Sequence, residues 1–409
     1  MASVFDTLKE RGFVSQCSDE EGLRRRLDSE QVSFYIGFDP TARSLHIGNL
    51  LQLLFMAHLQ RAGHRPIAVV GGGTCRIGDP SGKTEMRRIL PVETIQENAQ
   101  CFRKQISRFL DFSDGKALMV DNSEWLAPLN YIEFLRDIGR HFSVNRMLSF
   151  ETYKMRLETG LSFIEFNYQL LQAYDYLTLY RKYGCRLQMG GDDQWGNIVA
   201  GMDLIRRVES ADAYALTSPL VIRSDGKKMG KSEKGALYLD PDLVSPYEFY
   251  QYWINVPDAD VEQFLMRFTF LPVAEVKDLC ASDVMEAKRA LARQITTMVH
   301  GEDAASSAAE GAKAAFGGGG GADLSGVPSL EIPAGEFSPG INAVDLFVRT
   351  GLCATKSDAR RLIAQGGASV NRRTVASIEE AVTADMAEDG LLLLRSGKKR
   401  YFRVLLGRA

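Results

Sequence analysis

The sequence predicts an α/β fold over residues 34–222, with a mostly parallel sheet wound with helices. Short apolar runs rich in strand formers alternate there with longer segments of helical periodicity. Several of the runs lead into loops rich in Gly and Asp, the turn chemistry expected where strands end. Because ligands of such sheets bind beyond the carboxyl ends of the strands, we expect the functional site where these loops meet.

The individual elements follow from this periodicity. The predicted strands are 34–38, 66–70, 117–121, 186–189 and 219–222. The predicted helices are 47–63, 92–110, 131–142 and 163–183, preceded by N-terminal helices within 4–27.

Composition limits the class of protein. The 409 residues, 45% of them hydrophobic, are enough for two or three domains with real cores. The apolar run Leu50–Leu59 is too short to span a bilayer, and charges near the N-terminus argue against a signal peptide, so we expect a cytoplasmic protein without membrane association. The six cysteines are scattered without a Cys-x-x-Cys pair, which predicts reduced thiols and no metal site.

Charge is distributed unevenly along the chain. The net charge is −3, yet residues 341–409 contain 12 Lys and Arg against 7 Asp and Glu. A basic tail on an acidic body favours contact with nucleic acid, although an ordinary solvated basic surface would have the same composition.

The most informative junction is the stretch from Phe34 to Gln52, which predicts strand, loop and helix. The start of a helix has unpaired N–H groups and a favourable dipole, so it suits a phosphate. His46 and Gly48 stand at that start, although a histidine there can also be an ordinary polar cap. The sequence His46-Ile-Gly-Asn49 resembles the His-Ile-Gly-His signature of class I aminoacyl-tRNA synthetases and related adenylyl transferases. The downstream sequence Lys228-Met-Gly-Lys-Ser232 resembles the Lys-Met-Ser-Lys-Ser loop of the same class.

The helix predicted at 163–183 carries a polar stripe. Tyr168, Gln172 and Asp175 lie at i, i+4 and i+7 and therefore share one face. Such a stripe is often only the solvated side of a helix. If this one faces inward, its polar groups require a polar ligand.

Four features together resemble one family, the bacterial-type tyrosyl-tRNA synthetases. They are Tyr35 in the first strand, Asp79 after a Gly-rich turn, the polar stripe, and the Gly-Asp-Asp-Gln-Trp-Gly-Asn loop at 191–197. The resemblance covers most of the chain. It implies a Rossmann-like catalytic domain that forms tyrosyl-adenylate from L-tyrosine and ATP, and then transfers tyrosine to the terminal adenosine of tRNA(Tyr).

The resemblance also implies residue roles. Tyrosine-binding residues would be Tyr35, Asp79, Tyr168, Gln172, Asp175 and Gln194. ATP-binding residues would be Gly37, Asp39, Gly48, Asn49, Gly191, Asp193 and Lys231. The groups around the phosphates would be Thr41, His46, Lys83, Arg87, Lys228 and Lys231. Mg²⁺ would accompany ATP, with no protein-bound metal or prosthetic group.

Three positions depart from the family pattern. Asn49 replaces the second signature histidine, and Gly230 stands where the class has Ser. Asp192 adds a second carboxylate beside Asp193, where this family often has Ser, and the sequence alone offers no reason for it.

The domain organisation follows from motif and composition. We expect the Rossmann-like domain at 1–222 with an inserted dimerisation segment at about 125–160, the lysine loop and connector at 223–246, and an α-helical anticodon-side domain at 247–316. Five glycines open a linker at 317–340. Residues 341–409 resemble an α+β S4 RNA-binding domain, with helices at 344–350 and 356–363 and a strand pair from 368. Its expected RNA-binding residues are Arg360, Arg361, Arg372, Arg373, Lys398 and Lys399. A homodimer is implied by the resemblance alone.

Three alternatives stay open on the sequence. One is a tryptophan-charging relative, which the Tyr35/Asp175 pair opposes. Another is an adenylyl transferase that never touches tRNA, which the basic tail opposes. The third is a non-catalytic RNA-binding protein on a synthetase fold, which His46, Lys228 and Lys231 oppose.

Overall fold

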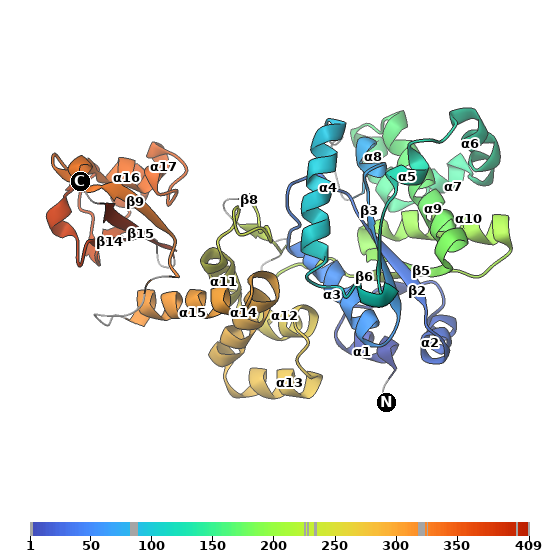
Figure 1. Cartoon of the computed structure of the whole chain (residues 1–409), viewed down its shortest axis with the longest axis horizontal. Helices are drawn as coiled ribbons and strands as arrows, with labels where there is room; N and C mark the ends of the chain where they lie inside the picture. The colour runs from blue at the N-terminus through green and yellow to red at the C-terminus, as the bar shows by residue number, and fades with distance from the viewer. Residues whose placement is uncertain are drawn as a thin grey trace. The chain divides into compact units, whose positions relative to one another are not determined.

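The computed structural model describes residues 3–81, 89–224, 226, 229–232, 235–317, 324, 326–397 and 400–407, with only the backbone described at 231, 232, 235 and 315–317. The chain forms two compact units. The first is Met1–Leu243 with Val256–Leu291, and the second is Val244–Asn255 with Ala292–Ala409. Figure 1 labels their elements.

A six-stranded sheet forms the centre of the first unit. Its strands are β1 (Gln16–Cys17), β2 (Ser33–Phe38), β3 (Arg65–Val70), β4 (Leu118–Asp121), β5 (Cys185–Gly191) and β6 (Tyr214–Ser218). Their order is β1-β6-β5-β2-β3-β4, and every pair except β1–β6 is parallel. The chain proceeds from β2 outward on one side and from β5 outward on the other, so the switch point lies between β2 and β5. The predicted α/β class with a mostly parallel sheet is confirmed.

Helices flank this sheet (Figure 1). They are α1 (Val4–Glu10), α2 (Glu20–Ser29), α3 (Ile47–Arg61), α4 (Val92–Ile106), α5 (Ser123–Leu126), α6 (Tyr131–Asp137), α7 (Val144–Leu148), α8 (Glu151–Thr159), α9 (Phe163–Tyr183) and α10 (Trp195–Glu209). Leu50, Leu54 and Phe55 are among the buried residues of α3, which explains its strongly apolar sequence.

Local sequence fixes both ends of α9, the helix that carries the polar stripe. Ser162 and Glu165 form a reciprocal capping box at its start, and Gly184 ends it at φ +61°. Glu165 also forms a buried ion pair with Arg156 of α8 at 2.8 Å. Tyr168 and Asp175 of the stripe are buried, so this face of α9 points into the unit.

The structure corrects several details of the predicted secondary structure. The strand expected at 219–222 is reduced to a single bridge residue, Ile222, because Pro219 has no N–H to donate to a ladder and β6 ends at Ser218. The N-terminal helices expected within 4–27 are present as α1 and α2, but the short antiparallel edge strand β1 lies between them. The helix expected at 131–142 is interrupted after Asp137, and a 3₁₀ turn (Gly139–His141) follows.

Two further helices belong to the first unit, α12 (Val261–Phe268) and α13 (Val273–Ser282). The buried Arg11 guanidinium donates hydrogen bonds to the Met266 and Thr269 carbonyls at 2.8 and 3.0 Å. It therefore satisfies carbonyls that the end of α12 leaves without helical partners. This contact fixes α12 to the N-terminal part of the unit.

The second unit contains helices and a small mixed sheet. Its helices include α11 (Pro246–Ile254), α15 (Glu302–Gly317), α16 (Ala343–Arg349) and α17 (Lys356–Ala364), and α14 (Val284–His300) contributes residues to both units. A five-stranded sheet has the order β12 (Arg373–Thr374), β11 (Ala368–Val370), β14 (Leu391–Ser396), β15 (Arg400–Gly407), β9 (Ser329–Pro333). Its core includes Leu346, Phe347 and Leu392. The α+β character predicted for the tail agrees with this arrangement.

No helix among the described residues is long and apolar enough to cross a membrane.

Candidate functional site

The loop between β2 and α3 ends in a helix cap made by the predicted signature. His46 is the N-cap of α3, and its Nδ1 accepts a hydrogen bond from the Gly48 N–H at 3.1 Å. The Asn49 Oδ1 accepts in return from the His46 N–H at 3.0 Å. Because Nδ1 acts as an acceptor, the ring hydrogen resides on Nε2. Asn49 therefore closes a capping box, which accounts for an amide at the second signature position.

Gly48 is required by the position of this imidazole. A Cβ at Gly48 would lie 2.9 Å from the His46 Cε1. Both residues are exposed, so a ligand can reach the start of α3 from solvent. The first turn of α3 thus presents a helix dipole and a ring donor to an anion.

The second signature lies against the first. The segment after it pairs with the segment before α3, since the Ile47 N–H donates to the Leu237 carbonyl at 3.2 Å and the Leu239 N–H to the Leu45 carbonyl at 2.9 Å. Gly230 has φ +82°, and a Cβ there would lie 3.3 Å from the Ile47 Cβ. A left-handed backbone in close contact with α3 explains why glycine replaces the serine of the class pattern.

The predicted cations near this junction are only partly described. Lys83, Arg87 and Lys228 lie outside the described residues. Lys231 is described by its backbone, in the short strand β7 (Lys231–Ser232) that pairs with β8 (Gly235–Ala236). The backbone of Lys231 therefore directly follows the Gly230–Ile47 contact.

Asp39, which follows β2, connects the loop after β3 with helix α9. Its carboxylate accepts hydrogen bonds from the Thr74 hydroxyl at 2.7 Å and from the Tyr168 hydroxyl at 3.0 Å. A Cβ at Gly71 would lie 1.9 Å from the Asp39 Oδ1, so only glycine fits there. Burial, together with Asp39, raises the pKa of the Tyr168 phenol well above its ordinary value. Tyr168 therefore stays a neutral donor.

A second contact brings together the loops after β3 and β5. The Gln194 Nε2 donates to the Asp79 Oδ2 at 2.7 Å, and the Ser81 N–H donates to the Asp79 Oδ1 at 2.9 Å. Asn197 donates in turn to the Ser81 hydroxyl and to the Gln194 Oε1, each at 3.3 Å. Asp79 and Gln194, predicted from separate motifs, are thus direct neighbours.

The innermost part of the site is a buried carboxylate. Asp175 is 4% exposed and accepts hydrogen bonds from the Asn122 Nδ2 at 2.9 Å and the Trp125 Nε1 at 2.7 Å. Burial raises the pKa of Asp175 to about 7, although the hydrogen bonds from Asn122 and Trp125 oppose the rise. Sequence reasoning missed both donors. The rule that ligand groups follow strand ends applied to them as well, because they come directly after β4.

Tyr35 of β2 lies in the electrostatic field of this carboxylate. Desolvation and the charge of Asp175 raise the pKa of the Tyr35 phenol well above its usual value. Within the described part of the chain, the Tyr35 hydroxyl and the Gln172 Oε1 are buried without a hydrogen-bond partner. Buried polar atoms of this kind require a partner, so the site is built for a polar ligand.

Other predicted residues lie on the loops of the same strand ends. Gly37 near the end of β2 is exposed, and a Cβ there would meet no atom within 4 Å. The exposed Thr41 donates its N–H to the Asp39 carbonyl at 2.8 Å. A Cβ at Gly191 would lie 2.6 Å from the Asp193 Oδ1, so this glycine gives the Asp193 side chain room.

Asp192 has a structural explanation. Its carboxylate accepts from the Ser15 hydroxyl at 2.7 Å, the Thr217 hydroxyl at 2.6 Å and the Gln16 Nε2 at 3.4 Å. These bonds join the end of β5 to β6 and to the edge strand β1. The second carboxylate therefore holds the site loop in place.

The predicted RNA-binding residues of the tail are surface groups of the second unit. Arg360 and Arg361 lie on α17, and Arg361 forms an ion pair with Asp358. Arg372, at φ +68°, and Arg373 form the turn into β12, and Arg373 forms an ion pair with Glu380. Lys398 and Lys399 lie outside the described residues.

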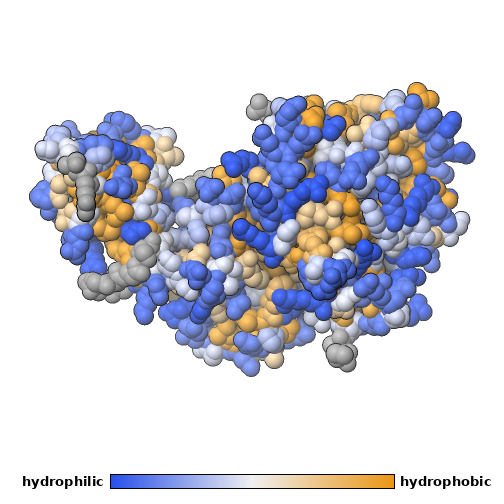
Figure 2. All heavy atoms as spheres, viewed as in Figure 1, coloured by the Kyte–Doolittle hydropathy of each residue, from blue (hydrophilic) through white to orange (hydrophobic). Residues whose placement is uncertain are grey.

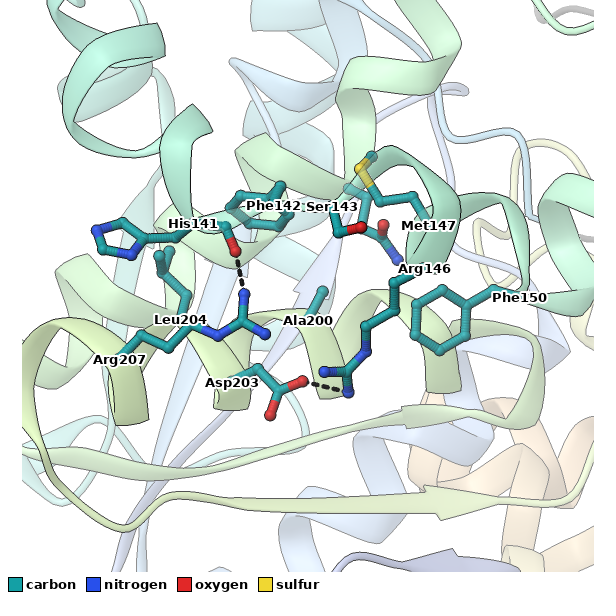
Figure 3. Close-up of a pocket in the computed structure, with 11 residues that line it drawn as sticks. His141, Phe142, Ser143, Arg146, Met147, Phe150, Ala200, Asp203, Leu204 and Arg207 are labelled. Carbon is teal, nitrogen blue, oxygen red and sulfur yellow. Dashed lines mark hydrogen bonds and ion pairs between the residues drawn. The ribbon is translucent and has the colours of Figure 1, made fainter.

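A small cavity lies apart from the predicted site residues, none of which lines it. Figure 3 shows Arg146 reaching Asp203, and Arg207 reaching the His141 carbonyl, across this cavity. Its walls come from α7, α9, α10 and the turn before α7. Among the described residues no group of three His, Cys, Asp or Glu side chains could hold a metal ion.

Comparison with known proteins agrees with this geometry. The profile of the family "tRNA synthetases class I (W and Y)" matches residues 27–317, and that of the "Tyrosine--tRNA ligase SYY-like C-terminal domain" matches residues 322–404. The chain is 54% identical to the tyrosine–tRNA ligase of Acetivibrio thermocellus over 99% of its own length and 100% of that protein. It is 55% identical to the enzyme of Clostridium tetani, covering 99% of both chains.

A solved structure gives the same result for the fold. A C-terminally truncated mitochondrial tyrosyl-tRNA synthetase from Aspergillus nidulans superposes with a TM-score of 0.70 at 28% identity, covering 77% of this chain and 95% of that one. With two signature motifs in contact, a buried carboxylate beside a buried phenol, and this similarity along its whole length, the chain belongs to the class I tRNA synthetases of the W and Y family, among the tyrosine–tRNA ligases.

Proposed function

We propose that this enzyme attaches L-tyrosine to tRNA(Tyr) in two steps, through a tyrosyl-adenylate. The observation that carries the proposal is the buried Asp175 carboxylate beside the unpartnered Tyr35 hydroxyl. A substrate phenol can donate to the first and accept from the second. Phenylalanine would leave both groups without a hydrogen-bond partner. A site built to bind a substrate hydroxyl rejects the analogue that lacks it, and tyrosyl-tRNA synthetases are a standard example of this rule.

The amino-acid end of the substrate meets the polar groups of α9 and the neighbouring loops. Asp79, Tyr168 and Gln172 bind the ammonium group, and Gln194, which already donates to Asp79, lies near the carboxylate. Tyr168 donates to Asp39 in the structure, so its oxygen keeps a lone pair to offer to an ammonium group. Asp39 extends the same network toward ATP.

The first step needs no general base. A substrate carboxylate has an ordinary pKa of about 3.5, so it is already ionised when it attacks the α-phosphorus of ATP. Attack forms the new C–O–P bond and releases pyrophosphate, and negative charge builds on the phosphoryl oxygens. The N-terminus of α3 and His46 stabilise this charge, joined by Thr41 and by Lys83, Arg87, Lys228 and Lys231.

The nucleotide is held by backbone as much as by side chains. Gly37, Gly48 and Gly191 allow close approach, and Asn49 and Asp193 contribute polar contacts. Mg²⁺ enters with ATP, since such ions are bound largely through substrate phosphates. In the second step a ribose hydroxyl of the terminal tRNA adenosine attacks the mixed anhydride, and AMP leaves.

The tail supports tRNA binding. Arg360, Arg361, Arg372 and Arg373 of the second unit, with Lys398 and Lys399, contact tRNA phosphates in an S4-like domain, and the preceding helices face the anticodon side. The basic composition of residues 341–409 favours this role. The six scattered cysteines suit the reducing cytoplasm, where we place the enzyme.

The segment at about 125–160 supports a homodimer. Large apolar side chains are exposed on it and at the start of α9, and they include Ile132 at 70%, Val144 at 55%, Leu157 at 54% and Phe163 at 71%. Figure 2 shows hydrophobic side chains over the region that holds α6 and α7 in Figure 1. A patch of this kind is typical of an interface between subunits. Light scattering should give twice the chain mass.

Pyrophosphate exchange into ATP, run with each of the twenty amino acids, tests the proposal. We expect exchange with tyrosine alone, followed by charging of tRNA(Tyr) that weakens as salt rises. Exchange with tryptophan would instead identify the protein as a tryptophan-charging relative. Exchange with no amino acid would contradict the proposal and favour an RNA-binding protein without catalysis.

A further inference from the structure

We propose that Asp260 is a positioning residue for adenylate formation, because its buried carboxylate fixes the chain segment that leads into the second signature motif. The inference rests on the proposed function. It concerns a residue that lies outside both signatures and was not predicted from the sequence.

Asp260 forms an unusually complete set of contacts with one distant residue. It is 1% exposed and ends the 3₁₀ turn η5 (Asp258–Asp260), directly before α12. The Ser224 N–H donates to both of its carboxylate oxygens, at 3.0 and 3.1 Å, and the Ser224 hydroxyl donates to Oδ2 at 3.1 Å. The Gln263 Nε2 supplies a further bond to Oδ1 at 2.9 Å.

Burying a carboxylate is costly unless hydrogen bonds compensate it. Here the compensation comes mainly from Ser224, which lies 36 residues earlier in the chain. Hydrogen bonds to an ionised acceptor are stronger than neutral ones, and the backbone N–H that faces both oxygens restricts the orientation of the peptide. Ser224 is itself exposed, and these bonds fix its backbone to the Asp260 carboxylate.

The support beneath Asp260 is itself anchored. Arg11 donates to the Met266 and Thr269 carbonyls at the far end of α12, so the helix is fixed at both ends within the same unit. A displacement of Ser224 would require breaking the carboxylate contacts or moving α12. We call the hydrogen bonds between Asp260 and Ser224 the clamp. Through α12 and Arg11, the clamp connects Ser224 to the N-terminal part of the unit.

The segment beyond Ser224 has fixed points as well. The Met229 N–H donates to the Val221 carbonyl at 2.9 Å, and Leu237 donates to the Gly230 carbonyl at 2.7 Å. Gly230 then packs on Ile47 at the start of α3. Without the bonds to Asp260, Ser224 would lose its contact with the residue that precedes α12. The backbone that delivers Lys231 would then be less well placed for the phosphates.

Displacing a catalytic group by about 1 Å can lower the reaction rate roughly 100-fold. We therefore expect Asp260→Ala to lower kcat for tyrosine-dependent pyrophosphate exchange by about 30-fold. KM for ATP should change less, because the loss is mainly in the transition state. Tyrosine affinity without ATP, measured by calorimetry, should stay the same, since Asp175 and Tyr35 are untouched.

Two variants accompany this one. Glu262→Gln removes an exposed carboxylate from the first turn of α12 and should leave exchange unchanged. Asp260→Asn keeps one acceptor for the Ser224 N–H and should recover part of the lost rate. If Asp260 had a purely structural role, Asp260→Ala would lower tyrosine affinity and the exchange rate together. Asp260→Asn would then change both quantities in parallel.

The inference is overturned if Asp260→Ala exchanges at close to the wild-type rate, or if it loses tyrosine binding in proportion to exchange. If Asp260→Ala fails to fold, Ser224→Ala provides the test, because it removes one hydroxyl hydrogen bond to Asp260 and leaves α12 intact. A fall in exchange of about threefold with normal tyrosine binding supports the clamp, and an unchanged rate refutes it. Failure of the proposed function is distinct, since the wild type itself would then show no exchange with tyrosine.

Discussion

The two ends of the candidate site are built on different physical principles. The phenol end consists of side chains buried among secondary structure, with Asp175 held by Asn122 and Trp125 and with Tyr35 in the field of that carboxylate. The phosphate end consists of backbone and exposed groups, with His46 capping α3 and Gly230 packed on Ile47. The first is buried, whereas His46 and Gly48 at the second are exposed to solvent.

This difference separates specificity from rate. A buried carboxylate discriminates strongly because an unsatisfied group there costs its full desolvation energy. An exposed helix terminus discriminates little, but it stabilises charge that appears only in the transition state. Substitutions at the phenol end should therefore act on the choice of amino acid, and those at the phosphate end on kcat for all substrates.

The largest effect should come from Lys231→Ala at the phosphate end. Loss of one group that stabilises transition-state charge typically costs about 100-fold or more in kcat. Tyrosine affinity should be unchanged, because the phenol pocket is intact. Stopped-flow measurement of adenylate formation gives both quantities, and an unchanged rate with weakened tyrosine binding would reverse the assignment of the two ends.

Asp175→Asn should act at the opposite end, with a somewhat smaller effect. Replacing an ionised acceptor with a neutral one should lower kcat/KM for tyrosine by about 100-fold, while the weak reaction with phenylalanine changes little. Pyrophosphate exchange with both amino acids measures the ratio. Asp212→Asn, at an exposed carboxylate, is the matched control. Equal losses of kcat/KM for tyrosine and phenylalanine would show that Asp175 does not recognise the phenol.

The pH dependence should follow the ionisation of Asp175. Burial raises its pKa from 3.8 to about 7, so the carboxylate that accepts the phenol is lost as pH falls below about 7. Tyrosine affinity should fall about tenfold between pH 8 and pH 6. Between the two pKa values the folded protein binds more protons than the unfolded chain, so its stability without ligand should decrease as pH rises through that window. Asp175→Asn should lack both slopes, and a wild type with the same flat profile would contradict the role of burial.

Trp125→Phe should produce the smallest effect. The substitution keeps an aromatic ring and removes only the N–H that donates to Asp175 at 2.7 Å. One lost hydrogen bond should weaken tyrosine binding about fivefold and move the pH profile to higher pH, because that donor lowers the pKa of the carboxylate. Calorimetric titration at several pH values measures both changes. A profile that does not move would show that Trp125 does not stabilise the charged form.

Much of the arrangement was predictable because it depends on local chemistry. Strand-end loops and the stripe of α9 indicated Asp39, Asp79, Tyr168 and Gln194. Hydrogen bonds join these residues in two pairs, Asp39 with Tyr168 and Asp79 with Gln194. Asn122 and Trp125 were missed, since a single Asn or Trp after a strand has no distinctive pattern.

Tertiary context decided the features that the sequence left unexplained. Asp192 could not be interpreted because its three donors come from β1, β6 and the chain before them. The role of Asp260 could not be predicted for the same reason, because its partner Ser224 lies 36 residues away in the sequence. Contacts of this kind join segments that are far apart in the sequence, and periodicity carries no information about which segments meet.

A crystal structure with a non-hydrolysable tyrosyl-adenylate analogue tests the central claim most directly. We expect the phenol oxygen within hydrogen-bond distance of Asp175 and Tyr35, and the phosphate at the start of α3 beside His46 and Lys231. An analogue bound with its phenol away from Asp175, or its phosphate away from α3, would contradict the account.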